Sequence, residues 1–353
     1  MPGKTGYIKY GDERIKVAMK LIIQIPCFNE EKTLAETVAD LPRHIDGIDV
    51  IEYLIINDGS KDRTVEVARE CGVHYAVQFK KNKGLAKGFM AGLDACLRLG
   101  ADIIVNTDAD NQYKGSDIEK LVRPILDGTA DCVIGSRPIE DIEHFSARKK
   151  RLQRLGSSVV RYFSGTEVED APSGFRAYSR AAAMKLNVMN NYTYTMETLI
   201  QTGQAKLAIA CVPIGTNPET RKSRLFKSMF SYIRRSGITI LRSFMMYKPM
   251  KFFFALGSVL ILVGVVIDIR FLVYYFMNES AGHIQSLILS VLLLLVGFIL
   301  IVAALLSELI STNRRLLEEI QTRVRSMDYR MQRMPEDEIN RIEKLSDSDG
   351  AAR

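Results

Sequence analysis

The chain has 353 residues, of which 47% are hydrophobic and 25% are charged, and its formal net charge at pH 7 is +7. This length suits one large domain with an appendage or two ordinary domains, and the composition is that of a globular protein with an apolar excess. Five cysteines without a C-x-x-C pair and four histidines without metal-ligand spacing exclude a disulfide framework and a zinc site. The basic excess suits nucleic acid, anionic lipid head groups or a phosphorylated substrate.

Residues 1–19 contain no apolar core of signal-peptide length and are expected to form an N-terminal extension. Over residues 20–224, short apolar runs rich in β-branched residues alternate with segments of helical period. The expected strands are 20–26, 51–57, 73–79, 102–107 and 131–136, and the expected helices lie near 30–41, 62–71, 84–99 and 116–127. Strands apolar on both faces, each followed by a helix, predict an α/β domain with a mainly parallel, Rossmann-like sheet that helices cover on both sides.

Four of the expected strands end in polar stretches, which read PCFNEE, NDGSKD, TDADNQ and GSRP. Open parallel sheets bind their ligands at the carboxyl ends of the strands. We therefore expect all four stretches to converge on one crevice.

Residues 225–251 interleave basic residues with apolar ones that fall on one side of a helix. The pattern predicts either interfacial amphipathic helices that contact membrane lipids or a surface helix that packs on the sheet.

Two long apolar segments follow, at residues 252–277 and 286–310. About 20 apolar residues span a bilayer, so residues 252–310 are expected to form a transmembrane helical hairpin. Asp268 and Arg270 are expected at the head-group level or paired with each other, because charge at the bilayer centre is costly. The connection has no Lys or Arg, whereas basic residues flank the other ends. The positive-inside rule then places the large domain and both termini in the cytoplasm, and we expect a prokaryotic plasma-membrane protein.

Residues 311–335 carry a heptad pattern of apolar residues that includes one polar position, Asn313. The pattern fits a cytoplasmic coiled coil that would make a homo-oligomer together with the spans. It fits equally well an amphipathic helix that folds onto its own catalytic domain or onto the membrane surface. Residues 336–353 are expected to form a largely disordered tail.

Asp108 and Asp110 stand one residue apart after an expected buried strand. The pair alone allows a cap, a solvated turn or a metal site. Together with Gln112 it supplies hard oxygen ligands for Mg²⁺ or Mn²⁺, and such an ion completes its shell with waters and substrate phosphates. The basic residues that would hold further phosphate groups are Arg137, Arg221, Lys222 and Arg224. This combination predicts a diphosphate leaving group and an anionic acceptor.

Six motifs lie in order between residue 20 and about residue 224: PCFNEE, NDGSKDRT, NKGLAKG, TDADNQ, GSR and DAPSGFRAY. In these motifs the chain resembles the family 2 glycosyltransferases with the A-type nucleotide-sugar fold. Within that family it is similar to the polyprenyl-phosphate glycosyltransferases, a group that includes dolichyl-phosphate mannose synthase and bacterial glucosyl carriers with paired C-terminal membrane helices. The resemblance implies metal-dependent, inverting transfer of a hexose from a nucleotide sugar, such as UDP-glucose or GDP-mannose, to a polyprenyl or dolichyl monophosphate.

The resemblance also implies which residues bind the donor. They are Pro26, Phe28, Glu30, Asp58, Asp108, Ala109 and Asp110. Asp58 would face the base or the ribose, and Asp110 with Gln112 would hold the Mg²⁺ or Mn²⁺.

On the acceptor side, the resemblance places Arg137 and Ser173 at the acceptor or the transferred group. A basic loop with Arg221, Lys222 and Arg224 would hold the phosphates. The expected catalytic residues are Asp110, Arg137 and Asp170.

Three departures from the family pattern stand out. Cys27 and Phe28 occupy positions where relatives often have Thr-Tyr, and Asn57 stands where a first acidic residue is common, so Asp58 is expected to be the functional member. The basic loop lacks the Gly-Glu-Ser-Lys run of relatives.

The expected role of Asp170 follows from the acceptor. Relatives that act on sugar hydroxyls use an acidic residue in this region as a general base. A polyprenyl phosphate is already anionic at neutral pH, so Asp170 is expected to orient the site.

Two other functions are open to a chain with this nucleotide-binding domain. A processive polysaccharide synthase would carry a Gln-x-x-Arg-Trp motif, and this chain contains no Trp. A catalytically inactive membrane scaffold would not need the intact Asp108, Asp110 and Gln112. Nucleic acid is not expected as a partner, because the basic residues cluster beside the membrane segments. The motifs do not distinguish uridine from guanosine donors or one hexose from another, although the overall resemblance favours a uridine donor.

Overall fold

The structure is a computed structural model that describes residues 7–10, 13–16, 18–137, 168, 170–188, 194–217, 249–277, 284–330 and 342–345. The chain divides into two compact units. The first unit is Met1–Ser231 together with Thr322–Arg353, and the second is Tyr232–Gln321. Each unit is described by itself.

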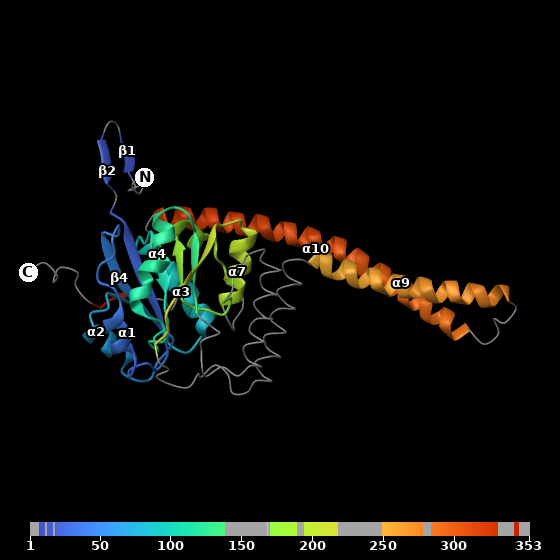
Figure 1. Ribbon diagram of the computed structural model, residues 1–353, viewed down its shortest axis with the longest axis horizontal. Coiled ribbons are helices and arrows are strands. Elements are labelled where there is room, and N and C mark those ends of the chain that lie inside the picture. The colour runs from blue at the N-terminus through green and yellow to red at the C-terminus, as the bar shows by residue number, and fades with distance from the viewer. Residues whose placement is uncertain are drawn as a thin grey trace, which may run out of the picture. The chain divides into compact units, whose positions relative to one another are not determined.

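An eight-stranded sheet, counted over the described residues, forms the centre of the first unit (Figure 1). Its strands are β3 (Lys20–Cys27), β4 (Val50–Asn57), β5 (Tyr75–Gln78), β6 (Ile103–Asn106), β7 (Cys132–Ser136), β8 (Arg176–Ser179), β9 (Ile209–Pro213) and β10 (Ile342–Lys344). The strand order is β10-β5-β4-β3-β6-β8-β7-β9. The pairs β4–β5, β3–β4, β3–β6 and β7–β9 are parallel, whereas β8 and β10 run antiparallel to their neighbours.

Helices cover both faces of this sheet. They are α1 (Leu34–Asp40), α2 (Thr64–Glu70), α3 (Leu85–Arg98), α4 (Ile118–Leu126, after the 3-10 turn Gly115–Asp117), α6 (Arg180–Lys185) and α7 (Thr195–Gln204). Because side chains alternate along a strand, Ile23 and Ile25 of β3 pack in the cluster that contains α1, α2 and α4, whereas Ile22 packs with α3, α6 and α7. The apolar runs of the central strands thus fill two cores at once.

The mainly parallel sheet with helices on both faces confirms the predicted fold class. All five predicted strands and all four predicted helices are present, with ends shifted by a few residues. Sequence analysis missed β8, which lies antiparallel between β6 and β7. It also did not identify the short hairpin of β1 (Tyr7–Tyr10) and β2 (Glu13–Lys16) inside the N-terminal extension.

The second unit contains α9 (Pro249–Phe276) and most of α10 (Ile284–Arg330), both of which are long and apolar enough to cross a membrane. The two helices pack closely at Gly257 and Gly297: a Cβ on either glycine would lie within 2.9 Å of the backbone oxygen of the other. Close approach through small residues is typical of helix packing in membranes. Helix α10 continues without interruption from the second predicted span into the predicted C-terminal helix.

Asp268 and Arg270 of α9 have partners in this unit. Asp268 accepts a hydrogen bond from the buried Ser290 of α10, and the Arg270 guanidinium lies 5.5 Å from the centre of the Tyr274 ring. Of the two expected arrangements, pairing of Asp268 with Arg270 is therefore not found among the described residues, and a position at the head-group level stays a prediction. A hydroxyl donor on the neighbouring helix stabilises the carboxylate instead.

Gly59 allows the turn after β4 to reach the segment that precedes α3. Its φ is +72°, and a Cβ there would lie 2.7 Å from the carbonyl carbon of Lys81. Both the left-handed backbone and the close approach require glycine. The glycine of the NDGS motif is thus required by the backbone geometry of the turn, independently of ligand binding.

Alanine variants of Gly59 and Gly72 distinguish the cost of a left-handed backbone from the cost of close packing. Gly72 has a φ of +76° but nothing within 4 Å of its Cβ position. We expect Gly72→Ala to lower the free energy of unfolding by about 1–2 kcal/mol, the cost of the left-handed backbone. Gly59→Ala should cost about 1–3 kcal/mol more, because the backbone must move apart. Thermal unfolding midpoints of the two full-length variants test this, and equal decreases would contradict it.

Candidate functional site

The predicted site residues gather at one edge of the sheet. Strands β3, β4 and β6 run parallel, so their carboxyl ends, with the polar stretches that follow them, lie at this edge. Strand β8 is antiparallel to β6 and β7, so its amino end and the preceding loop 170–175 lie at the same edge as the carboxyl end of β7. The structure therefore brings together the four polar stretches and the DAPSGF stretch.

The first two stretches interlock through hydrogen bonds. The backbone N–H of Asn29, whose φ is +55°, donates to Ser60 Oγ at 3.0 Å, and that of Glu30 donates to Thr64 Oγ1 at 2.9 Å. The hydroxyl of Thr33 donates to the Glu30 carboxylate at 3.0 Å. These bonds hold the backbone around Phe28, whose side chain is 40% exposed. The apolar ring of Phe28 is thus partly exposed at this edge, whereas Glu30 is buried.

Asp58 fastens the loop before α3. Its two carboxylate oxygens accept hydrogen bonds from the backbone N–H groups of Lys83, at 2.6 Å, and Gly84, at 2.9 Å. Burial raises the pKa of Asp58 above its ordinary value, and these hydrogen bonds oppose the increase. Asn57, the departure from the family pattern, accepts a bond from the N–H of Ser60 at 2.9 Å. It therefore shapes the turn in which Asp58 is held.

The acidic turn that follows β6 is held on both sides. Thr37 of α1 donates its hydroxyl to Ala109 O at 3.0 Å. Within the turn, Gln112 N–H donates to Asp110 Oδ1 at 3.3 Å, and Asn111 has a left-handed φ of +55°. On the other side, Asn217 donates its side-chain amide to Asn111 O at 3.0 Å and its N–H to Gln112 O at 2.9 Å. The segment that leads toward the basic loop is thus anchored on the acidic turn.

The donors of this turn suit a hard divalent cation. Among the residues that the structure describes, no group of three or more His, Cys, Asp or Glu side chains has the arrangement of a metal site. Asp108, Asp110 and Gln112 nevertheless place two carboxylates and an amide oxygen within one turn. Mg²⁺ and Mn²⁺ favour oxygen ligands, and Mg²⁺ commonly binds one or two protein carboxylates with substrate phosphates. The donor set therefore fits an ion that a diphosphate helps to hold.

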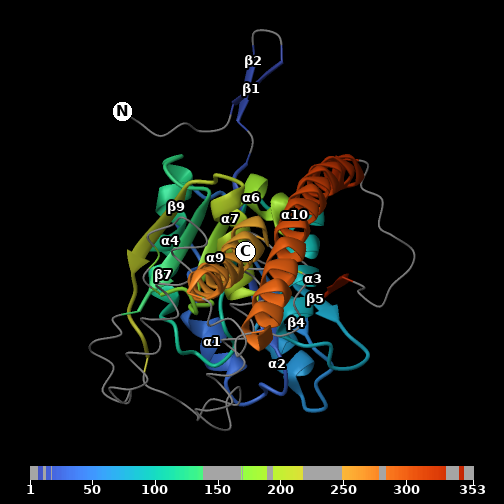
Figure 2. The same ribbon diagram turned by 90° about the vertical axis from the view of Figure 1, so that its right-hand side faces the viewer.

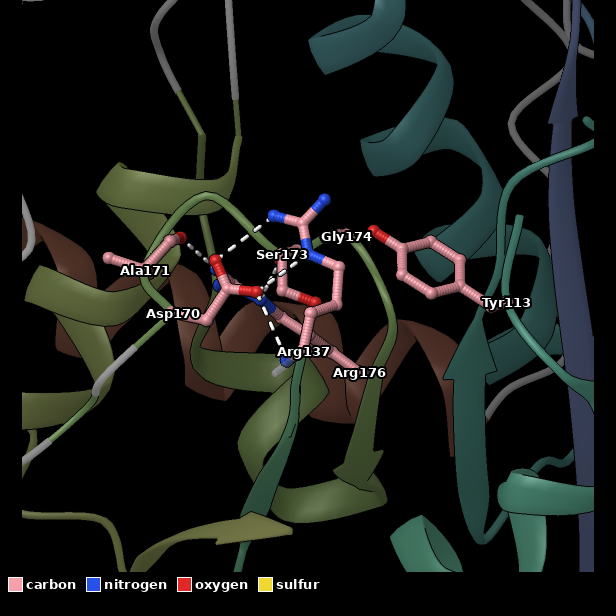
Figure 3. Close-up of polar contacts among 7 residues, drawn as sticks. All are labelled: Tyr113, Arg137, Asp170, Ala171, Ser173, Gly174 and Arg176. Atoms are coloured by element: carbon pink, nitrogen blue, oxygen red, sulfur yellow. Dashed lines mark hydrogen bonds and ion pairs between the residues drawn. The ribbon is translucent and has the colours of Figure 1, made fainter. Parts of the chain in front are cut away.

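Arg137 and Asp170 form a bidentate ion pair at the edge (Figure 3). Arg137 Nε lies 2.7 Å from Asp170 Oδ2, and Nη2 lies 3.0 Å from Oδ1. Asp170 is fully buried, and the Arg137 side chain is 17% exposed. Although burial disfavours the charged guanidinium, the neighbouring Tyr113 and Asp170 raise the pKa of Arg137 above its ordinary value. Arg137 thus remains a cation in a fixed orientation.

Sequence analysis did not identify the residues that shape the loop 170–175. Arg176 is fully buried, and its guanidinium donates to Ala171 O, Ser173 O, Thr195 O and Thr198 Oγ1, each at 2.7–2.8 Å. Arg176 is the first residue of β8, which directly follows the loop (Figure 3). The motif DAPSGFRAY contains this arginine, but the sequence does not indicate that its side chain is buried against the loop. The hydrogen bonds from Arg176 to Ala171 O and Ser173 O stabilise the loop conformation.

Two further side chains fix Gly174 in this loop. Tyr113, next to Gln112, accepts a hydrogen bond from Gly174 N–H at 3.2 Å (Figure 3). Its ring also stacks on Phe175, with the ring centres 4.8 Å apart. Burial raises the pKa of Tyr113 to about 12, so the phenol stays neutral. Asn106 at the end of β6 donates its amide to Gly174 O at 2.9 Å. These contacts join the acidic turn to the loop 170–175.

Asp108, expected at the nucleotide, lies close to Gly174, and Ser173, expected at the acceptor or the transferred group, is buried. A Cβ built on Gly174 would lie 3.4 Å from Asp108 Oδ2, so the Asp108 carboxylate lies against the loop 170–175 as well as in the donor-side turn. The Ser173 hydroxyl is buried and has no hydrogen-bond partner in the structure. Direct contact of this hydroxyl with an acceptor therefore requires the loop to shift.

Arg221, Lys222 and Arg224 lie outside the described residues, as do residues 225–248, for which amphipathic helices were expected. The described chain stops at Asn217 on the acidic turn and resumes at Pro249. The roles of the basic loop stay predictions.

Comparison with known proteins agrees with this geometry. The family described as glycosyl transferase family 2 matches residues 22–186. A UDP-N-acetylglucosamine–dolichyl-phosphate N-acetylglucosaminyltransferase of Methanococcus voltae is 34% identical over 223 residues, which cover 57% of this chain and 87% of the relative. The glycosyltransferase AglJ of Haloferax volcanii is 26% identical over 307 residues, which cover 85% of this chain and 96% of the relative.

The solved structures similar to this one share its fold. Glucosyl-3-phosphoglycerate synthase from Mycobacterium tuberculosis in complex with UDP superposes with a TM-score of 0.51 at 22% identity, covering 64% of this chain and 80% of the other. At this identity the likeness concerns the fold alone. The family match, the 34% identity over most of a relative's length and the shared motifs agree, and the chain belongs to glycosyl transferase family 2.

Proposed function

We propose that this protein is a membrane-bound, inverting glycosyltransferase that moves a sugar from a nucleoside-diphosphate sugar to a polyprenyl or dolichyl monophosphate. The observation that carries the proposal is the fixed Arg137 cation at the same sheet edge as the acidic turn Asp108–Gln112. The names of the relatives support a lipid-phosphate acceptor, and the two long apolar helices support a membrane location.

The donor binds, in this proposal, along the ends of β3, β4 and β6. The exposed ring of Phe28 packs against the nucleotide, and Asp58 marks the nucleoside end. Asp108, Ala109 and Asp110 line the diphosphate. We favour a uridine donor, and the M. voltae relative is named for one.

A divalent cation held by Asp110 and Gln112 would neutralise the charge that develops on the departing nucleoside diphosphate. Asp110 is assigned as the main protein ligand, because its carboxylate lies in the turn that Gln112 N–H closes. Mg²⁺ and Mn²⁺ accept the same oxygen donors, so the ion that binds depends on the concentration of each metal in the cell as well as on these ligands.

The acceptor needs no protein base. A phosphate monoester has a second pKa near 6 and is anionic at neutral pH. One of its oxygens forms the bond to the anomeric carbon while the bond from that carbon to the diphosphate breaks, which inverts the configuration. Arg137 orients the acceptor phosphate, and Asp170 orients Arg137 through both of its oxygens. Arg221, Lys222 and Arg224 are proposed to hold further phosphate charge.

The membrane part of the proposal follows from charge distribution. Lys248 and Lys251 precede the first apolar segment at residue 252, and Arg314 and Arg315 follow the second apolar segment, so the catalytic unit and both termini are assigned to the cytoplasm. The acceptor phosphate would lie at the cytoplasmic head groups. Homo-oligomerisation through the spans and the C-terminal helix stays a prediction.

The activity itself can be tested with membranes that contain the protein. Incubated with a polyprenyl phosphate, Mg²⁺ or Mn²⁺ and one nucleotide sugar at a time, they should form a lipid-phosphate sugar. The donors to compare are UDP-glucose, UDP-N-acetylglucosamine and GDP-mannose. Chelation of the metal should abolish the product, and membranes with Asp110→Asn serve as the control. Formation of no lipid-phosphate sugar from any donor would contradict the proposal.

Asp170→Asn and Asp110→Asn distinguish an orienting carboxylate from a general base. A general base contributes about 10²- to 10⁴-fold to the rate. Asparagine keeps one oxygen for Arg137, so we expect Asp170→Asn to retain at least about tenfold more turnover than Asp110→Asn, with an unchanged pH profile. Thermal unfolding and donor binding must remain intact in both variants. Equal losses of turnover would count against a purely orienting role of Asp170.

A further inference from the structure

The C-terminal end of the chain completes the sheet of the first unit. Strand β10 pairs antiparallel with β5, with Glu343 opposite Ala76, and forms the outer strand (Figure 2). The Glu343 carboxylate accepts hydrogen bonds from Gln78 and, at 3.1 Å, from Arg69. Leu345 is 9% exposed and packs in the core. The residues that sequence analysis assigned to a disordered tail thus include an ordered strand.

The end of α10 contacts the same unit beside α3. Tyr329 donates its hydroxyl to Asp94 at 2.7 Å, and Asp328 accepts a hydrogen bond from Arg98 at 2.8 Å. The Arg98 guanidinium also lies 5.2 Å from the centre of the Tyr329 ring. One turn earlier, Arg325 donates to Leu186 O at 2.8 Å. Residues 325–329 therefore bind the catalytic unit of their own chain, as one of the two sequence-based alternatives stated.

These two attachments flank one short segment of the chain. Residues 79–84 connect β5, which β10 covers, with α3, which Tyr329 and Asp328 hold. This segment donates the two backbone N–H groups of Lys83 and Gly84 to Asp58, and it packs on Gly59. Both elements that flank the segment 79–84, namely β5 and α3, are thus attached to residues more than 200 positions further along the chain.

We infer that the C-terminal segment, consisting of residues 322–330 and β10, is a strap that positions the 79–84 segment for donor binding. Asp328, Tyr329 and Glu343 are positioning residues in this arrangement, because they act through β5 and α3. The inference rests on the proposed function in assigning Asp58 to the donor's nucleoside end. Release of the strap should weaken donor binding more than it slows the transfer step.

The ladder between β10 and β5 offers a matched pair of variants. Hydrogen-bonded and non-hydrogen-bonded pairs alternate in an antiparallel ladder. Leu345 N–H donates to His74 O at 2.8 Å, so Glu343 N–H also points at β5, whereas Lys344 N–H points outward. Proline removes an N–H and is tolerated on an edge strand where that group faces away. Glu343→Pro should therefore release the strand, and Lys344→Pro is the control.

The kinetic test uses the full-length protein in membranes. Glu343→Pro removes the ladder N–H and the carboxylate that binds Gln78 and Arg69, and we expect it to raise the KM for the nucleotide sugar about two- to tenfold relative to Lys344→Pro. The kcat and the KM for the lipid phosphate should stay within about twofold. Tyr329→Phe, which removes only the bond to Asp94, should change the donor KM in the same direction. An unchanged donor KM, or equal changes in all three constants, would overturn the inference.

A second readout is independent of the reaction. The amides of Lys83 and Gly84 should exchange hydrogen for deuterium faster in Glu343→Pro than in Lys344→Pro. Unchanged exchange over residues 79–85 would refute the strap, even if the protein transfers sugar. Faster exchange in a protein that forms no lipid-phosphate sugar would support the strap and reject the proposed function. A smaller assembly in Glu343→Pro would show that β10 comes from a second copy and would also overturn the intrachain assignment.

Discussion

The ion pair between Arg137 and Asp170 is the interaction on which the proposed acceptor side of the site depends. A fully buried carboxylate is costly unless a cation and hydrogen bonds compensate it, and removing one partner of such a pair typically costs about 3–5 kcal/mol. Here both carboxylate oxygens bind the guanidinium of a residue that directly follows β7. The pair joins the end of β7 to the loop 170–175, and so it fixes the direction in which Arg137 presents its charge.

The two halves of the site have different supports. On the proposed acceptor side, Arg176 binds the carbonyl groups of the loop 170–175, while Tyr113 and Asn106 bind Gly174. The proposed donor side depends on Asp58 and on the close packing at Gly59. Asp108 lies between them, in the acidic turn and against Gly174. The Asp108 carboxylate therefore links the acidic turn with the loop 170–175.

The central strands were predictable because their apolar runs face two cores, and the polar residues that follow them are short-range signals. Strand β8 was not, because it has four residues and begins with an arginine whose partners come from α7 and from the loop itself. Strand β10 pairs with β5 across more than 260 residues of sequence, and no local pattern encodes such a partner. The heptad pattern of residues 311–335 likewise could not select between a second copy and the chain's own catalytic domain, because the contacts of Asp328 and Tyr329 with α3 join residues more than 200 positions apart.

The sequence alone determined the α/β fold class, the two long apolar helices and the polar stretches at the strand ends. Each follows from the periodicity and composition of neighbouring residues. Only the tertiary structure decided that Asp170 holds Arg137, that Arg176 and Tyr113 shape the loop 170–175, and that Ser173 is buried. It also decided that the C-terminal end attaches to β5 and α3. These features depend on which side chains become neighbours when distant segments pack, and on the cost of burying polar groups without partners.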